Sequence, residues 1–511
     1  MNFFWLLLVL GLFTYLILQR SVPRITRTPI WLLWLVMMTP AAVLGFWAIV
    51  HGEDQPIPAI VAIAPFVLCF ALYWWLVYRG RKPRESPTPD TTVPPPSNDA
   101  VIDAEEEFNP PASRLRPFDR EEETKLKDCF PWSVYYIHNL EYRPQAVICR
   151  GQLRTDPDNA YKTVRDNIER GFGDRFLVVF HENWNAQQPF FVLVPNPQAQ
   201  TIDRSESLPG DTPKGSRSRE RTESDPILQP NFAALLLLIT LFTTTGSGAI
   251  FSGVSPTDLQ DDPALLLRGL PYSLSLIAIL GTHELGHYLA AQWYKIRATL
   301  PFFIPFPVFL GTFGAFIQMR SPVPHRKALF DVSLAGPVAG LAIALPLLVW
   351  GFAHSEIVPL TENSGLLSFD SLTPSFSLLL TLIGKLTFGS ALTAQKAIDL
   401  HPVAIAGYLG LIVTAFNLMP IGQLDGGHMV HAMFGQRTAL GIAQVVRLLM
   451  LLLAFIHRDL WVWALLFFFM PIRDEPALND VSELDNTRDF LGLLALTFLA
   501  IILLPAPNLL M

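Results

Sequence analysis

The side chains best suited to chemistry lie within an apolar run that covers residues 270–293. His283 and His287 are four residues apart, so on a helix both imidazoles project from one face and can reach the same metal ion. Glu284 follows the first histidine and would lie beside that ion. Because an apolar run of this length can cross a bilayer as one helix, these groups are expected at membrane depth. Titratable groups are costly there unless they are paired or bind something, so the spacing predicts a zinc site.

A zinc ion that catalyses hydrolysis usually takes three protein ligands, so a third ligand must come from elsewhere in the chain. Asp425 is favoured because it ends an apolar stretch that is broken by Pro420 and followed by glycines, which let the backbone turn and the carboxylate swing toward a partner helix. His428, one turn further on, is an alternative ligand or a hydrogen-bond partner of a ligand. Two plainer interpretations stay open: histidines that hydrogen-bond to neighbouring helices, and a solvated aspartate at an ordinary helix end. The other titratable residues expected near membrane depth are Asp331, Lys385, His401 and His431.

The composition indicates a polytopic α-helical membrane protein that carries a small soluble α+β insert. Charged residues make up 16% of the chain and hydrophobic residues 51%, whereas soluble domains are about a quarter charged. Long apolar blocks alternate with one polar block. The formal net charge of −7, without a concentrated basic face, excludes nucleic acid as an expected partner. The three cysteines have no paired spacing and are expected to be free thiols.

The distribution of apolar runs divides the chain into several expected parts. Residues 1–80 contain apolar runs at 2–18, 31–50 and 59–78 and are expected to form an N-terminal three-span membrane segment without a cleaved leader. Basic residues in the first loop and after the third run place the insert on the cytoplasmic side. The following parts are a disordered proline-rich and acidic linker at 81–112, a cytoplasmic α+β module at 113–200, a flexible linker at 201–230, a membrane core with the candidate site at 231–430 and a C-terminal membrane segment at 431–511.

The polar insert at 113–200 is expected to be one small folded module. Its strands are predicted at residues 132–137, 146–149, 175–180 and 190–194, and its helix at 160–172. The last two strands are expected to form a hairpin around a polar turn. His138 and His181 lack catalytic spacing, so we expect them to be structural.

Two apolar stretches of the membrane core are not expected to be plain spans. Residues 300–319 contain Pro301, Pro305 and Pro307 among other breakers, which favours a re-entrant hairpin whose backbone is satisfied by protein or a wet cavity. A kinked packing helix is the alternative. Residues 375–392 are expected not to cross fully, because only then does the following span bring Asp425 to the depth of the histidines.

Two motifs, taken together and in this order, resemble the site-2 protease family of intramembrane metalloproteases, its bacterial and chloroplast members included. The first is His283-Glu284-Leu285-Gly286-His287, and the second is Asn417-x-x-Pro420-x-x-x-Leu424-Asp425-Gly426. The resemblance covers residues 231–430, within which 311–316 resemble the hairpin of that family. The stretch 288–416 is too apolar to hold the PDZ module that some members insert there.

The resemblance implies an enzyme, an intramembrane zinc metalloendopeptidase with one Zn²⁺ per chain. The metal ligands would be His283, His287 and Asp425, with Glu284 as the base and Asn417 as a donor that stabilises the oxyanion or orients the substrate. Its function would be regulated intramembrane proteolysis, the hydrolysis of peptide bonds within or near transmembrane helices.

The expected partners are a transmembrane protein substrate, the lipid bilayer and a regulatory partner of residues 113–200. The expected location is a bacterial plasma membrane or a thylakoid membrane, which the chain would cross several times. The alternatives are a membrane zinc transporter or metal sensor, in which Glu284 is a further ligand, and a catalytically silent scaffold that acts through the soluble module.

Overall fold

The computed structural model describes residues 28–51, 120–143, 146–182, 188–196, 230–255, 257–307, 309–360, 372–393, 395–456 and 460–507, with isolated positions between 65 and 79 and at 369. The chain divides into two compact units, Met1–Glu107 and Phe108–Met511. In the first unit, α2 (Ile30–His51) coincides with the second predicted span. The predicted span at 2–18, the linker at 81–112 and nearly all of the linker at 201–230 lie outside the described residues.

The second unit contains the helices of the membrane core. Among the described residues, five helical stretches are long and apolar enough to cross a membrane: α7 (Pro230–Phe251), the stretch Pro263–Trp293 that includes α9 (Leu270–Trp293), α10 (Arg326–Ala353), α13 (Asp425–Ile456) and α15 (Asn486–Leu503). The shorter apolar helices are α11 (Leu378–Phe388), α12 (Pro402–Asn417) and α14 (Trp461–Phe469). This set fits the predicted polytopic membrane protein.

The helix α11 is too short to cross a bilayer. Its 11 residues measure about 16 Å along the axis, whereas the hydrocarbon core of a bilayer is about 30 Å thick. The structure therefore agrees with the expectation that residues 375–392 do not cross as a single helix. The smaller elements around it are α8 (Asp258–Asp261) and the antiparallel pair β7 (Glu356–Pro359) and β8 (Lys396–Asp399).

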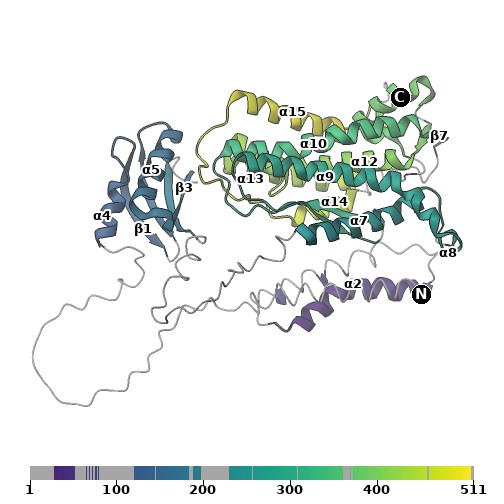
Figure 1. The fold of residues 1–511 in the computed structure, drawn as a ribbon, viewed down its shortest axis with the longest axis horizontal. Helices are drawn as coiled ribbons and strands as arrows, with labels where there is room; N and C mark the ends of the chain where they lie inside the picture. Colours follow the sequence, from purple (N-terminus) through teal and green to yellow (C-terminus); the bar gives the residue numbers. More distant parts are fainter. Residues whose placement is uncertain are drawn as a thin grey trace, which may run out of the picture. The chain divides into compact units, whose positions relative to one another are not determined.

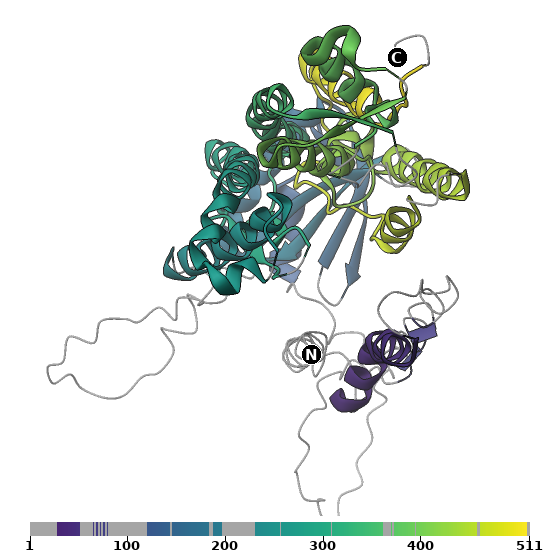
Figure 2. The same ribbon diagram turned by 90° about the vertical axis from the view of Figure 1, so that its right-hand side faces the viewer.

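The helices α9, α10 and α12 pack side by side and form the centre of the membrane core (Figures 1 and 2). Small residues let their backbones approach: a Cβ added to Gly407 of α12 would lie 2.8 Å from the Cα of Leu348 on α10. A Cβ added to Gly351 would lie 2.4 Å from the backbone nitrogen of Ala404. Close approach of this kind is typical of helix packing in membranes, where small residues line the interface.

The stretch with many breakers is a β-hairpin. Its strands, β5 (Phe302–Pro305) and β6 (Thr312–Phe316), pair antiparallel, so a kinked helix is excluded. The turn needs glycine: Gly311 has a φ of +81°, and a Cβ there would lie 2.4 Å from the Cα of Thr244 on α7. The hairpin is thereby held against α7.

The soluble module is a four-stranded antiparallel sheet in the order β1-β2-β4-β3. Its elements are α4 (Arg120–Asp128), β1 (Tyr135–Arg143), β2 (Ala146–Leu153), α5 (Pro157–Phe172), β3 (Phe176–Glu182) and β4 (Pro189–Pro195). The predicted hairpin is present, with Phe176 opposite Pro195 and Glu182 opposite Pro189. The first strand begins later than predicted because the backbone N–H groups of Val134 and Tyr135 both donate to the Pro131 carbonyl, which closes a turn.

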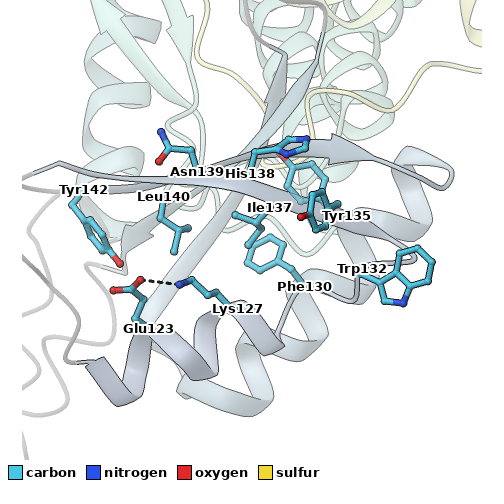
Figure 3. Close-up of a pocket in the computed structure, with 11 residues that line it drawn as sticks. Glu123, Lys127, Phe130, Trp132, Tyr135, Ile137, His138, Asn139, Leu140 and Tyr142 are labelled. Atoms are coloured by element: carbon cyan, nitrogen blue, oxygen red, sulfur yellow. Dashed lines mark ion pairs between the residues drawn. The ribbon is translucent and has the colours of Figure 1, made fainter.

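A groove of about 700 Å³ lies between α4 and β1 of the module (Figure 3). The lining includes His138, the exposed Trp132, and an ion pair of 3.0 Å between Glu123 and Lys127. No group of three potential metal ligands occurs on the described walls of this groove. The candidate chemistry therefore belongs to the membrane core.

Candidate metal centre

The two histidines of the first motif lie in the middle of α9 and are buried. Their Nε2 atoms are 3.2 Å apart, and the two rings meet at 71° with centroids 4.9 Å apart. Both His283 and His287 are less than a tenth exposed. The four-residue spacing thus directs both imidazoles into one place, as a helix requires.

The carboxylate of Asp425 meets both imidazoles. Its Oδ2 atom lies 3.4 Å from Nε2 of His283 and 3.3 Å from Nε2 of His287. Asp425 is the first residue of α13, directly after the loop that follows α12. The tertiary fold therefore brings the start of α13 to the middle of α9.

The glycines after Asp425 act differently from the expectation. Gly426 and Gly427 lie in the first turn of α13, so they do not form the backbone turn that the sequence suggested. A Cβ at Gly426 would lie 1.9 Å from the Leu418 carbonyl oxygen, and one at Gly427 would lie 2.3 Å from the Gly422 oxygen. Their lack of a side chain lets the start of α13 pack on the preceding loop, and this close packing places Asp425.

The helix α10 orients the histidines from the other side. Nδ1 of His287 lies 2.7 Å from the Val332 carbonyl oxygen, which can only accept, so Nδ1 carries the proton and Nε2 has a free lone pair. Gly336 and Gly340 leave room for the rings: a Cβ on Gly336 would lie 2.1 Å from Nε2 of His287. A Cβ on Gly340 would lie 3.1 Å from Nδ1 of His283.

Glu284 lies between the metal centre and the hairpin. It is buried, and its carboxylate interacts with the backbone amide of Ile317, just after β6. The side chains of His287 and Asp425 lie near the same carboxylate. Glu284 is thus the residue that connects the candidate ligands to the strand where an extended chain could bind.

Asn417, the last residue of α12, also reaches the centre. Its Nδ2 atom lies 3.1 Å from Nε2 of His283. All five residues singled out in the sequence therefore come together: His283, Glu284, His287, Asn417 and Asp425.

The remaining titratable candidates have other partners. His428 does not turn toward the two histidines of α9, because its Nδ1 lies 2.7 Å from Asp474. His431 lies 2.6 Å from the same carboxylate. The others are held as follows: Asp331 pairs with Arg488, Lys385 donates to the Leu392 carbonyl, and His401 caps α12. Sequence inspection overlooked Asp474 and Asp480, whose signal is a polar run, 473–485, between two apolar stretches.

The donor atoms suit a zinc ion. Across the part of the chain that the structure describes, His283, His287 and Asp425 are the group whose ligand atoms all lie within 4.8 Å of one another. Oδ2 of Asp425 is buried and accepts no well-aligned hydrogen bond from the described residues. Two imidazole nitrogens and one carboxylate oxygen form a ligand set that zinc commonly takes, with a position left for water.

Comparison with known proteins agrees with this geometry. Residues 271–456 match the family model described as Peptidase family M50. The chain carries an M50 peptidase domain. This confirms the resemblance to the site-2 protease family. The matched range contains all five candidate site residues described above. Residues 124–201, which include most of the soluble module, match the model described as EGY3 middle domain.

Several curated proteins are similar to this chain. The chain is 29% identical over 381 residues to "Probable zinc metalloprotease EGY2, chloroplastic" of Arabidopsis thaliana, which covers 74% of this chain and 63% of the relative. It is 36% identical over 258 residues to EGY1 of the same plant, and this match covers 50% of this chain and 46% of the relative. It is 25% identical over 401 residues to EGY3 of Oryza sativa subsp. indica, and this match covers 75% of this chain and 64% of the relative. The match thus spans less than two thirds of these relatives.

Proposed function

We propose that this protein is a zinc-dependent endopeptidase that hydrolyses peptide bonds within or near the transmembrane helices of its substrates. The observation that carries the proposal is the meeting of two imidazole nitrogens and one carboxylate oxygen, 3.2 to 3.4 Å apart, in a core of membrane-length helices. The M50 match and the zinc metalloprotease names of the relatives support it. No observation favours a zinc transporter or a metal sensor.

His283, His287 and Asp425 would hold one Zn²⁺ per chain. Once bound, zinc supplies a water of lowered pKa and polarises the carbonyl of the peptide bond. The chain prepares the ligands for it: the Val332 carbonyl fixes the tautomer of His287, and the bare backbone at Gly336 leaves the ring free to point at the ion.

Glu284 would move the protons. It follows a ligand, it is buried, and it lies beside the carboxylate and the imidazole of the centre. We propose that it accepts the proton of the attacking water and returns it to the leaving amine. Asn417 would donate its side-chain N–H to the oxygen of the scissile carbonyl, a role commonly worth a few kcal/mol in the transition state.

The hairpin would present the substrate. A transmembrane helix hides its carbonyls in its own hydrogen bonds, so it must unwind before attack. Within the described residues, β6 pairs only with β5, and its Phe313 is 68% exposed. We propose that the unwound segment adds to β6 as a strand, next to the Ile317 amide that contacts Glu284.

The membrane that holds the protein and the roles of its two folded parts are also proposals. The relatives are named chloroplastic, which favours a thylakoid membrane or, for a bacterial chain, the plasma membrane. We propose that the part 113–200 faces the cytoplasmic or stromal side and receives a regulatory partner, whereas residues 231–430 form the protease core. To establish the side, cysteines can be introduced on the surface of α5, and their labelling can be measured in intact vesicles that contain the protein.

The decisive test compares wild type with Glu284→Gln. We expect both purified proteins to hold one zinc per chain, and the variant to cleave a transmembrane-helix peptide at least about 100-fold more slowly, because only the proton transfer is removed. Glu356→Gln, on the exposed position of β7, is the matched control and should cleave normally. A zinc-free wild type, or a Glu284→Gln variant with full activity, would refute the proposed function. Loss of metal from the variant would instead indicate Glu284 as a ligand, as in the transporter hypothesis.

A further inference from the structure

A second buried polar cluster lies outside the metal centre and has no part in the proposed chemistry. It consists of two carboxylates and the histidine and arginine side chains around them: Asp474, Asp480, His428, His431, His181 and Arg326. The side chains of Asp480 and His431 are 1% and 0% exposed. Charges buried so deeply are costly unless they are paired, so the pairing must be maintained in the folded protein.

His431 bridges the two carboxylates. Its Nδ1 lies 2.6 Å from Asp474, and its Nε2 lies 3.0 Å from Asp480. His428 lies 2.7 Å from the other oxygen of Asp474. Both histidines belong to the first two turns of α13, the helix that begins with Asp425. The segment between α14 and α15 therefore holds the end of α13 that carries the candidate zinc carboxylate.

Side chains from two other elements also contact Asp480. Nε of Arg326, at the start of α10, lies 3.1 Å away, and Nδ1 of His181, on β3 of the soluble module, lies 3.2 Å away. Burial alone would raise the pKa of Asp480, but its contacts with His181, His431 and Arg326 hold it well below the ordinary value. Asp480 is thus the point where the module, α10 and α13 meet.

The backbone makes the same connection. The N–H of Phe180 on β3 donates to the Leu478 carbonyl at 2.7 Å, and the N–H of Asp480 donates to the Phe180 carbonyl at 2.9 Å. On the other side, the N–H of Leu478 donates to the Val323 carbonyl at 2.9 Å, just before α10. Residues 478–480 therefore form a short segment in which Asn479 is bridged both to Phe180 on the edge strand β3 and to His325 just before α10.

We propose that His431, Asp474 and Asp480 are positioning residues that couple the soluble module to the Asp425 carboxylate of the zinc centre. This inference rests on the proposed function. Displacing the segment 478–480 from β3 moves Asp480, which releases His431 and loosens the first turns of α13. A protein that binds the module at β3 then changes zinc affinity and cleavage without touching the centre.

The test uses the full chain in detergent and the variant Asp480→Asn, which keeps the shape and removes the charge. We expect its zinc affinity, measured by competition with a chelating indicator, to fall roughly 2- to 30-fold, the range of coupling through such networks. We also expect faster hydrogen exchange of the backbone amides 425–431. Asp166→Asn, exposed on α5, is the control and should match wild type in both measurements.

If Asp480→Asn does not fold, His181→Gln tests the same coupling from the module side, because it leaves the sequences of α13 and of the segment 478–480 unchanged. Wild-type zinc affinity together with wild-type exchange at 425–431 in a folded variant would overturn the inference. The exchange measurement needs no metal, so it decides the inference even if the wild type binds no zinc, a result that would refute the proposed function alone.

Discussion

At the scale of single residues, the metal centre depends as much on missing side chains as on ligands. His287 occupies space that exists only because Gly336 of α10 has no Cβ, and a Cβ at Gly340 would crowd His283 at 3.1 Å. The structure shows that these two glycines pack against the pair of imidazoles. The ligand geometry is therefore set by the neighbouring helix.

Replacing Gly336 by alanine should displace His287. The new Cβ would lie 2.1 Å from Nε2, a distance that no side chain tolerates, so the ring must move away from Asp425. We expect zinc affinity to fall about 10- to 100-fold, as when the supports of a metal ligand are removed. Metal analysis after dialysis measures this. Gly246→Ala on α7 is the control, because a Cβ there meets nothing within 4 Å; equal zinc content in the two variants would contradict the argument.

At the scale of elements, the hairpin β5–β6 matters because its second strand ends beside the proposed base. The geometry of β6 depends on Gly314, whose φ of +112° is open to glycine and strained for other residues. Distortion of this strand should therefore affect catalysis and leave the ligands of the metal in place.

The variant Gly314→Ala should retain zinc and lose roughly tenfold in kcat/KM, because backbone strain of about 1–3 kcal/mol is released by moving the strand. Peptide cleavage and metal content are measured on the same preparation. Gly253→Ala provides the same kind of strain, at a φ of +78° with nothing within 4 Å, in the turn that follows α7. If both variants cleave at one rate, the hairpin does not present the substrate.

At the scale of the whole molecule, the C-terminal segment packs against both the soluble module and the membrane helices. Val481 is 8% exposed and lies in the core of the soluble module, with Tyr135 and Phe180, although the sequence assigns it to the C-terminal membrane segment. Beyond it, Arg488 of α15 forms a paired contact with Asp331 of α10, at 2.8 and 2.6 Å. The segment 474–488 therefore ties the module to the helices of the M50 domain and its neighbours.

Shortening Val481 to alanine should destabilise the soluble module by about 2 kcal/mol, because it removes buried methyl groups from that core. Hydrogen exchange of residues 120–196 in the full chain should accelerate, whereas the centre of α9 should stay protected. Val445→Ala, 65% exposed on α13, is the control. Unchanged exchange in the module would show that the C-terminal segment does not support it.

The sequence by itself determined the elements whose signal is local. The apolar run at 270–293 and the spacing of His283 and His287 identified α9 and its candidate metal-binding turn, because helix periodicity alone places two imidazoles on one face. The breakers at 300–319 predicted a hairpin, and the runs at 132–137, 146–149, 175–180 and 190–194 predicted the strands of the module, although β1 began later because a turn at Pro131 came first.

Only the tertiary structure decided what depends on contacts between distant segments. It brought Asp425 within 3.4 Å of both histidines and assigned His428 to Asp474. It also joined the segment 478–480 to β3, which no local pattern signals. Helix and strand periodicity report neighbours in sequence, whereas ion pairs and shared strands are selected by burial, where an unpaired charge or N–H group is too costly to leave.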